Sequence, residues 1–404
     1  MKRLALLSTS DKTGLIDLAK SLVTEFDYEI ISSGGTAKTL KDAGISVTKV
    51  SDYTGFPEIL GGRVKTLHPR IHGGILARKD LPQDVEELNA NNIRPIDLVV
   101  VNLYPFEKTI SQPEVTLAEA IEKIDIGGPA MLRASAKNFA HLTVLCNPSQ
   151  YNSYLEELRK NTGEVSLEFR QKCALTGFQH TATYDQAIAT YLQEQQTTSE
   201  LEKSEKETFF LSGKKIKTLR YGENPHQSAT WYQRGINASG WATSKILQGK
   251  ELSYNNLVDL EAARRIITEF SDAPTVAILK HTNPCGVAVD ETLLGAYEAA
   301  LAGDSVSAFG GIVALNKSID APTATAMTKT FLECVVAPGC EPEAEEIFQK
   351  KSKLRVLISP DLNQGESETI KVIAGGFLAQ DADNGVDNSS AVSYTHLRAH
   401  ETLT

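Results

Sequence analysis

Five basic side chains crowd into one short stretch of the sequence, residues 60–76, which reads LGGRVKTLHPRIHGGIL. They are Arg63, Lys65, His68, Arg70 and His72. Glycine pairs flank them on both sides, and glycine lets the backbone take positive φ and approach a ligand closely. Pro69 predicts a bend that denies the centre of the stretch a regular helix. We interpret the stretch as a shaped loop for an anionic small molecule, and the alternative is a solvated basic loop.

A zinc site is a second interpretation of the same stretch. His68 and His72 stand four residues apart, a spacing that zinc-binding helices use. The proline between them and the lack of a nearby third ligand argue against it, so we expect no metal here.

Two polar motifs further suggest an anion site. Ser33-Gly34-Gly35-Thr36 lies between a predicted strand and a predicted helix. Free N–H groups at a helix start and the positive end of the helix dipole hold a phosphate well. The motif at 10–12, Ser-Asp-Lys, follows the preceding strand and would supply a cation to the same anion. Each motif taken alone is equally compatible with simple helix capping.

A third motif, DIGGP, opens a predicted helix that carries Arg133 and Lys137. These two cations are four residues apart and share a helix face. A lysine beside other cations loses its proton more easily and can then act as a base. A pocket shared by Lys137 and Asp125 is one interpretation, and an ordinary amphipathic helix with a solvated lysine is the other.

Lys280 and His281 directly follow a predicted buried strand, VAIL, and precede an Asn-Pro pair. A neutral His281 could accept a proton near pH 7. The alternative is a strand end followed by an Asn-Pro turn. We interpret Cys285 as a small buried thiol and not as a nucleophile.

Apolar runs that alternate with helical patterns must position these motifs. We expect strands at 4–7, 28–31, 96–102 and 142–146 and helices at 12–24 and 36–43. Such alternation predicts a mostly parallel α/β sheet. Ligands of these sheets bind beyond the carboxyl ends of the strands, and the motifs at 8–12, 32–36 and 102–106 follow three of these strands.

Length and composition limit the classes of function. The 404 residues suffice for two or three domains, and a polar stretch at 193–207 predicts the boundary between them. The formal charge of -10 argues against a general nucleic-acid binder. Since no apolar stretch is long enough for a membrane span, we expect no membrane partner. The five cysteines form no CxxC pair and fit reduced thiols in the cytosol.

Seven motifs together make the sequence recognisable: LGGRVKTLHPRIHGGIL, NLYPF, DIGGPAMLRASAKN, RYGENPHQ, LSYNN, LKHTNPCG and SAFGG. In this order they resemble the bifunctional purine-biosynthesis proteins that combine AICAR transformylase with IMP cyclohydrolase. The resemblance implies an α/β fold with a methylglyoxal-synthase-like parallel-sheet domain at 1–195 and a linker at 196–207. A cytidine-deaminase-like α/β transformylase domain would follow at 208–388. It also implies a cytoplasmic homodimer with transformylase sites formed between subunits.

The chemistry implied by this resemblance is the last two steps to IMP. The 5-amino group of AICAR takes a formyl group from 10-formyltetrahydrofolate. The carboxamide nitrogen of formyl-AICAR then attacks the formyl carbon, and water leaves. Lys137 corresponds to the cyclohydrolase base, with Lys65, Tyr104 and Asp125 assisting. Lys65 is our candidate for stabilising the developing oxyanion.

The resemblance also implies the remaining site residues. For the transformylase, His281 corresponds to the proton acceptor, and Lys280 would polarise the formyl carbonyl or tune the histidine. The implied nucleotide contacts of the first domain are Ser10, Asp11, Lys12, Ser33, Gly34, Gly35, Thr36, Arg63, Val64, Lys65, Thr66, Asn102, Asp125 and Ile126. The implied AICAR contacts of the second are Arg220, Tyr221, Asn256, Gly310 and Glu333.

One departure from the family is expected at the C-terminal end. Residues 389–404, SSAVSYTHLRAHETLT, resemble nothing in the family there, and we interpret them as a foreign tail. The family continues well beyond the motif at 376–381. We therefore expect a complete cyclohydrolase and an incomplete transformylase of doubtful activity.

Two rival functions fit part of the sequence. Methylglyoxal-synthase-like domains also occur as nucleotide-sensing regulatory modules, and a phosphate site alone cannot separate the two. The joint occurrence of Lys65, Tyr104, Asp125 and Lys137, with a second domain that carries Lys280, favours the enzyme. A methylglyoxal synthase proper is disfavoured because the chain is longer than one such domain.

Overall fold

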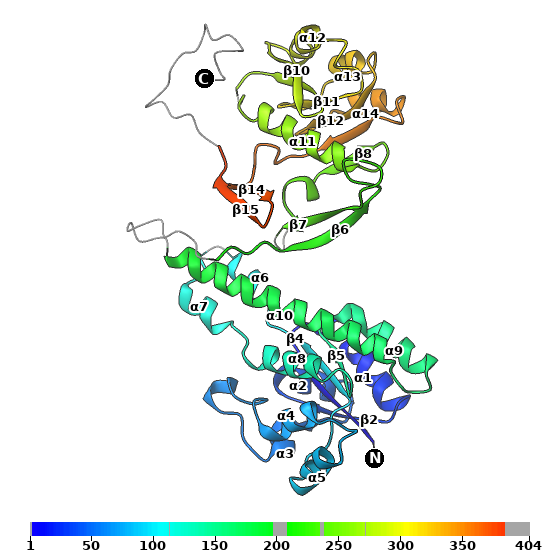
Figure 1. Ribbon diagram of the computed structural model, residues 1–404, viewed down its shortest axis with the longest axis vertical. Coiled ribbons are helices and arrows are strands. Elements are labelled where there is room, and N and C mark those ends of the chain that lie inside the picture. Colours follow the sequence, from blue (N-terminus) through cyan, green and yellow to red (C-terminus); the bar gives the residue numbers. More distant parts are fainter. Residues whose placement is uncertain (1, 113, 197–207, 235–237, 271, 384–404) are drawn as a thin grey trace. The chain divides into compact units, whose positions relative to one another are not determined.

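The computed structural model describes residues 2–112, 114–196, 208–234, 238–270 and 272–383. The chain divides into two compact units, Met1–Phe210 and Leu211–Thr404, and each is described by itself (Figure 1). The predicted linker after residue 196 and the predicted foreign tail at 389–404 lie outside the described residues.

A parallel sheet forms the centre of the first unit. Among the described residues it has five strands, in the order β3-β2-β1-β4-β5, and every pairing is parallel. The strands are β1 (Arg3–Thr9), β2 (Tyr28–Ser32), β3 (Thr48–Lys49), β4 (Leu98–Asn102) and β5 (Thr143–Leu145). β1 and β4 are apolar runs buried on both faces, as expected for the interior of a parallel sheet. The predicted parallel α/β sheet is confirmed.

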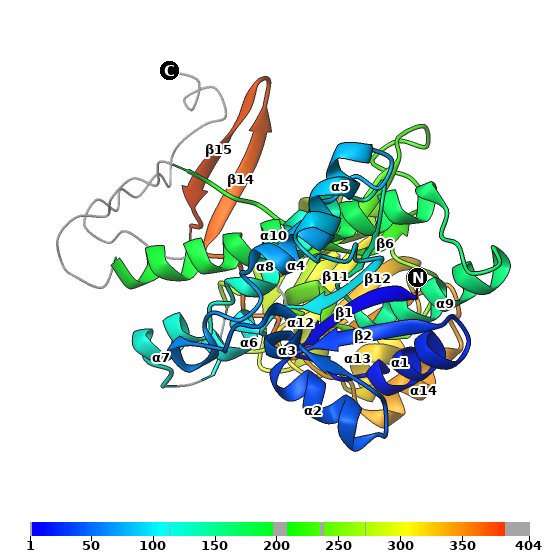
Figure 2. The same ribbon diagram turned by 90° about the horizontal axis from the view of Figure 1, so that it is seen from below.

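Helices cover both faces of this sheet. They are α1 (Leu15–Thr24), α2 (Gly34–Asp42), α3 (Val50–Thr54), η1 (Leu60–Gly62), α4 (Pro69–Leu76), α5 (Pro82–Ala90), α6 (Phe106–Ile110), α7 (Leu117–Glu122), α8 (Gly127–Lys137), η2 (Pro148–Gln150), α9 (Tyr151–Lys160) and α10 (Leu167–Gln196). α1 and α2 lie on one side of the sheet, and α4 and α8 lie on the other (Figure 2).

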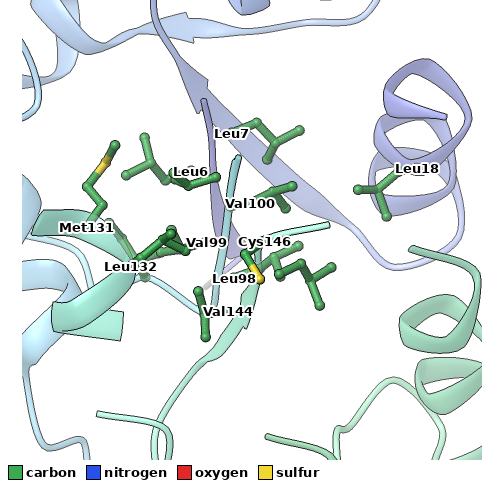
Figure 3. Packing of buried hydrophobic residues seen from close by; sticks show 14 of the residues in the cluster. Leu6, Leu7, Leu18, Leu98, Val99, Val100, Met131, Leu132, Val144 and Cys146 are labelled. Atoms are coloured by element: carbon green, nitrogen blue, oxygen red, sulfur yellow. The ribbon is translucent and has the colours of Figure 1, made fainter. Parts of the chain in front are cut away.

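The core of the first unit fills the space between the sheet and these helices. Figure 3 shows Leu7 of β1 turned toward Leu18 of α1, and Leu6 turned toward Met131 of α8. This alternation follows from the two-residue period of a strand. The long helix α10 packs against α8 and β5 and so fixes α8 from outside.

The second unit is built on a mixed sheet. In the described part of the chain, its strand order is β10-β9-β11-β12-β13-β8, with β11, β12 and β13 parallel and the other pairings antiparallel. The strands are β8 (Lys245–Gln248), β9 (Thr275–Lys280), β10 (Asn283–Val289), β11 (Gly311–Leu315), β12 (Leu332–Ala337) and β13 (Arg355–Ile358). Two separate hairpins add β6 (Gly213–Leu219) with β7 (Ala229–Arg234) and β14 (Glu368–Ile373) with β15 (Gly376–Asp381).

The helices of the second unit are α11 (Tyr254–Ile267), α12 (Leu293–Gly303), α13 (Ala321–Met327) and α14 (Pro342–Gln349), with the short η3 (Gly240–Ala242). α11 packs on β9 and β11 from one face, while α12 packs on β9 and β10. Within the described residues, no helix has the length and apolar character needed to cross a membrane.

Candidate active site

A cavity of about 720 Å³ opens at the carboxyl ends of β1, β2 and β4. β1 pairs with β2 on one side and with β4 on the other, the switch point at which parallel sheets bind ligands. The lining residues are Ser8, Thr9, Ser10, Lys12, Ser33, Gly35, Thr36, Gly61, Gly62, Arg63, Lys65, Thr66, Asn102, Tyr104, Ile121, Glu122, Lys123, Ile124, Asp125, Ile126, Gly127, Gly128 and Met131.

The start of α2 forms one wall of this cavity. Ser33 is the N-cap residue and has extended backbone angles, but in the described structure no side chain caps the helix. The first N–H groups of a helix have no partner within the helix. Together with the positive end of the helix dipole, they can therefore serve an anionic ligand.

Two lysines face the same wall. Lys12 Nζ donates hydrogen bonds to the backbone oxygen of Thr9 and, at 2.9 Å, to Thr36 Oγ1. Lys65 Nζ lies 3.7 Å from the place that a β-carbon on Gly34 would take. Burial lowers the pKa of Lys12, the charge of Asp11 opposes this, and the charge of Lys65 lowers it further. Two ammonium groups and an uncapped helix start thus converge, an arrangement that suits a phosphate dianion.

Asn102 shapes the loop that follows β1. Its Oδ1 accepts hydrogen bonds from the backbone N–H groups of Ser10 and, at 2.8 Å, Asp11, and its Nδ2 donates to the Asp11 carbonyl at 3.2 Å. The amide of Asn102 therefore holds the backbone of Ser10 and Asp11 at the cavity wall.

Asp125 lies at the start of α8 with its carboxylate partly buried. Its Oδ1 accepts a hydrogen bond from the Gly128 N–H at 2.8 Å, and its own N–H donates to the Tyr184 hydroxyl at 2.8 Å. Burial raises the pKa of Asp125, against the opposing effects of the Gly128 and Tyr104 backbone N–H groups and the Lys65 charge. A carboxylate with a raised pKa beside a cation is a candidate proton carrier.

Most of the predicted nucleotide contacts lie around this one cavity. The predicted residues that line it are Ser10, Lys12, Ser33, Gly35, Thr36, Arg63, Lys65, Thr66, Asn102, Tyr104, Asp125 and Ile126. Asp11, Gly34 and Val64 do not line it in the described structure. The carboxylate of Asp11 instead accepts the Thr13 N–H at 2.9 Å, and Val64 pairs with Ile59 in an isolated β-bridge.

Lys137 is the main correction to the predicted site. It is the last residue of α8, whereas Asp125 precedes the first. At 1.5 Å per residue, the two ends of this helix are about 15 Å apart. Lys137 lines a different, largely apolar groove with Arg133, Leu175 and Phe178. Hence the pocket that Lys137 was expected to share with Asp125 and Lys65 is not formed within one chain.

The basic stretch at 60–76 also differs from the prediction. Pro69 does not break a helix but begins one, because its ring suits the first helical position of α4. His68 Nδ1 caps this helix by accepting the Arg70 N–H at 3.1 Å, and the Arg70 guanidinium donates to the Asn92 carbonyl at 2.8 Å. Of the five basic residues in the stretch, only Arg63 and Lys65 line the cavity in the described structure.

The second glycine pair of that stretch serves packing and not ligand approach. A β-carbon on Gly74 would lie 2.6 Å from the Arg94 carbonyl oxygen, and one on Gly73 would lie 3.3 Å from Ile93. Gly61 and Gly62, by contrast, line the cavity with positive φ of 65° and 90°.

Sequence reasoning missed Glu122 and Lys123, which also line the cavity. The carboxylate of Glu122 pairs with the guanidinium of Arg63, with 3.3 Å between Nε and Oε1. The available signal was their position just before the DIGGP motif, from which Ile124 separates them.

In the second unit, His281 and Thr282 form the two-residue turn between β9 and β10. Both have positive φ, 50° and 64°, so the turn is of a kind that normally takes Asn and Gly. The Asn-Pro turn of the alternative interpretation is wrong, since Asn283 and Pro284 belong to β10. Asp259 of α11 accepts the Thr282 N–H at 2.8 Å and so holds the turn.

Lys280 lies beside other predicted AICAR contacts. Its ammonium donates to the Phe309 carbonyl and lies 3.1 Å from the place of a β-carbon on Gly310, whose φ is 73°. Asn256 Nδ2 donates to Glu333 Oε2 at 3.2 Å, and Arg355 pairs with the same oxygen at 3.6 Å.

Asp259 interacts both with the turn at His281 and Thr282 and with the cluster that holds Lys280 and Glu333. Burial raises its pKa, whereas the Thr282 N–H and the charges of His281 and Lys280 lower it, and the charge of Glu333 raises it. Sequence reasoning missed Asp259, although it stands three residues after Asn256 and so shares its helix face. Arg220 and Tyr221 contact each other, with the guanidinium 5.6 Å from the ring centre.

Potential metal ligands are scattered through both units. Among the described residues, no three His, Cys, Asp or Glu side chains come together in a way that could hold a metal ion. His68, one of the two histidines with zinc-like spacing, instead uses its Nδ1 to cap α4.

Comparison with known proteins finds two family models that match successive parts of the chain. The one described as "AICARFT/IMPCHase bienzyme" matches residues 135–402, and the one described as "MGS-like domain" matches residues 14–130. A curated protein of Trichodesmium erythraeum, named bifunctional purine biosynthesis protein PurH, is 91% identical over 390 residues, which are 96% of this chain and 75% of the relative.

Other relatives carry the same name. The protein of Nostoc punctiforme is 68% identical over 96% of this chain and 75% of its own length. A solved structure titled "Crystal structure of ForH" is 38% identical, covers 47% of this chain and 98% of its own, and has a TM-score of 0.43.

Proposed function

The chain belongs to the AICARFT/IMPCHase bienzyme family, and from this we infer a bifunctional enzyme of purine biosynthesis. Its two activities are AICAR formyltransferase and IMP cyclohydrolase, which its relatives' shared name supports. The rival interpretation, a nucleotide-sensing regulatory module, is not favoured. AICAR, formyl-AICAR and IMP are the proposed small-molecule partners.

The cyclohydrolase site is proposed to be the cavity of the first unit. The single observation that carries this is the convergence of Lys12, Lys65 and the uncapped start of α2 on one wall. The ribose phosphate of formyl-AICAR would bind there, because the helix N–H groups and the ammonium of Lys12 match a dianion, which leaves Lys65 for the reacting end of the substrate. Its imidazole would then extend toward Lys65, Tyr104 and Asp125, which line the same cavity.

Ring closure joins the carboxamide nitrogen to the formyl carbon. As the bond forms, negative charge develops on the formyl oxygen, and the ammonium of Lys65 would stabilise it. Asp125 is proposed to take the proton from the attacking nitrogen, and its raised pKa suits that task. Tyr104 assists. Asp125 then returns this proton to the former formyl oxygen, the formamido nitrogen gives up its own hydrogen, and the oxygen leaves as water.

A role for Lys137 as the base requires a second copy of the chain. Because α8 separates it from Asp125 by about 15 Å in its own chain, Lys137 could act only on the partner's cavity of a homodimer. The groove around it exposes Leu175 and Phe178, which a partner could cover.

Mixing two inactive variants tests this arrangement. If Lys137 acts on the partner's cavity, Lys65→Ala and Lys137→Ala each lose cyclisation, but mixed dimers hold one intact site. Random mixing then restores about a quarter of the wild-type rate for an isologous dimer. Failure of the mixture to recover, after exchange of subunits is shown by mass spectrometry, would rule out the trans role.

The transformylase site is proposed to form around the turn between β9 and β10. His281 would take the proton from the AICAR amino group while Lys280 polarises the formyl carbonyl of 10-formyltetrahydrofolate, the proposed cosubstrate. Asn256, Gly310 and Glu333 support this, because they lie in one cluster with Lys280 and Asp259. Arg220 and Tyr221 are proposed as further AICAR contacts.

We propose a cytoplasmic location for the protein. All five cysteines are free thiols in the described structure, which fits a reducing compartment.

The cyclohydrolase assignment is tested directly with formyl-AICAR. The protein is expected to convert it to IMP, with the change in ultraviolet absorbance that accompanies ring closure. Lys65→Ala should lower the rate by about 10²- to 10³-fold if its ammonium stabilises the oxyanion. A wild-type protein that leaves formyl-AICAR unchanged would refute the assignment.

A further inference from the structure

An ion pair joins two walls of the cavity in the first unit. Arg63 directly follows η1 and Glu122 ends α7, and both residues line the cavity. The two side chains make a two-point contact, Nε with Oε1 and the terminal nitrogen with Oε2. The guanidinium that could bind an anionic ligand is therefore already bound to an anion of the chain itself.

This ion pair is poorly suited to stabilising the fold. The side chains of Arg63 and Glu122 are 67% and 57% exposed. Exposed pairs contribute little to stability, because solvent screens the charges and two long side chains lose entropy. Stabilisation of the fold therefore does not explain this contact.

Arg63 lies on a small loop with an unusual backbone. Ile59 and Val64 exchange two backbone hydrogen bonds, of 3.2 and 3.4 Å, and close the loop. Leu60, Gly61 and Gly62 follow one another at positive φ of 54°, 65° and 90°. Since glycine reaches such angles at little cost, the tip of the loop can change conformation without disturbing the ladder at its base.

Two other charged groups of the cavity, those of Lys12 and Asp125, are engaged differently. Lys12 is held by Thr9 and Thr36, and the carboxylate of Asp125 is held by the backbone of α8. These contacts can persist when a ligand binds. The guanidinium of Arg63, in contrast, cannot form its two-point contact with a phosphate and with Glu122 at the same time.

We propose that Glu122 is a built-in competitor of the substrate's phosphate for Arg63. A phosphorylated ligand must displace Glu122 before Arg63 can bind it. Glu122 thereby lowers the affinity for phosphorylated ligands and leaves unphosphorylated ones unaffected. The proposal concerns the cavity named in the proposed function and rests on it for the identity of the ligand.

Glu122→Gln removes the charge and preserves the shape of the side chain. We expect IMP to bind this variant about two- to fivefold more tightly in calorimetric titrations at low salt, because an exposed charge contact of this kind is worth up to about 1 kcal/mol. Inosine, which lacks the phosphate, should bind both proteins equally. At 1 M salt the difference in IMP affinity should shrink, since the Debye length falls to about 3 Å and charges farther apart are screened.

Two matched variants isolate the role of Arg63. Glu25→Gln also removes one negative charge from an exposed Arg–Glu pair, with Arg159 at 2.9 Å, but away from the lining residues. It should leave IMP affinity unchanged. In an Arg63→Ala background, Glu122→Gln should change the affinity by less than about twofold, because the coupled partner is gone.

The outcomes separate this inference from the proposed function. If the wild type binds IMP but Glu122→Gln binds it equally or more weakly, Glu122 is not a competitor. An affinity gain of the same size in the Arg63→Ala background would also overturn the proposal. If the wild type does not bind IMP, the proposed function fails, and titration with inorganic phosphate still decides whether Glu122 opposes an anion. Glu122→Ala serves as a second variant and should follow Glu122→Gln.

Discussion

Replacing Asp259 by alanine tests how the turn that carries His281 is held. The carboxylate is the acceptor of the Thr282 N–H at 2.8 Å. A left-handed backbone costs an L-residue other than glycine roughly 1–2 kcal/mol, so His281 and Thr282 together require about 2–4 kcal/mol of compensation. A hydrogen bond to a charged group contributes about 1.5–3 kcal/mol. The two quantities are similar, so the turn should depend on this acceptor.

The assay is amide hydrogen exchange at Thr282, followed by nuclear magnetic resonance. Taking the lower value of about 1.5 kcal/mol, because Asp259 is partly exposed, Asp259→Ala should speed exchange roughly tenfold. Asp259→Asn keeps a carbonyl oxygen at the same place and should retain most of the protection. Amides in the centre of β9 serve as the internal reference.

Equal exchange at Thr282 in the wild type and in Asp259→Ala would refute this reasoning. The bonds from Thr282 Oγ1 and Asn283 Nδ2 to the His281 carbonyl, at 2.6 and 2.8 Å, would then be sufficient to hold the turn.

Three further predictions concern other parts of the chain. Gly34→Ala puts a β-carbon on a residue with φ 51°, close to the Lys65 ammonium. We therefore expect the variant to lose about 1 kcal/mol of stability and to bind IMP more weakly in calorimetry. Unchanged IMP affinity would contradict the role of the α2 start. Hydrogen bonds from Arg78 lower the pKa of Asp84 to about 2 from 3.8, so this pair stabilises the fold above pH 3.8 and its contribution is lost as the pH falls toward 2. The melting temperature of Asp84→Asn should therefore lie below that of the wild type at pH 6 and meet it at pH 2, and a constant gap would count against the pair. Gly286→Ala would bring a β-carbon within 2.0 Å of the Ala300 carbonyl oxygen, so the second unit should lose protection from proteolysis, and wild-type resistance would contradict that packing.

The sheet of the first unit and its cavity could be predicted from the sequence. Each apolar run is short, rich in β-branched or other large apolar residues and followed by a polar motif, and this pattern depends on local chemistry alone. Parallel strands bring their carboxyl ends to one edge, so the motifs after β1, β2 and β4 had to meet. The polar residues of these motifs, Ser33 among them, could therefore be assigned to one site from their positions in the chain.

Positions that depend on tertiary packing could not be predicted in this way. Spacing places Lys137 on a helix after Asp125, but only the fold shows that this helix runs away from the cavity. In the sequence, Arg70 is one more cation of a basic stretch. Only the structure shows that its guanidinium donates a hydrogen bond to the Asn92 carbonyl. In the sequence, Asp259 is an ordinary acid on a predicted helix. Only the structure shows that its side chain accepts a hydrogen bond from the turn between β9 and β10.

The uncapped start of α2 has a consequence for handling the protein in solution. An anion that occupies this helix end binds only the folded chain, so it shifts the unfolding equilibrium by mass action. At a concentration one hundred times its dissociation constant, such an anion would add about 2.7 kcal/mol to the free energy of unfolding. Phosphate or sulfate buffers would then give higher melting temperatures than buffers with bulky organic anions, whatever the catalytic state of the enzyme.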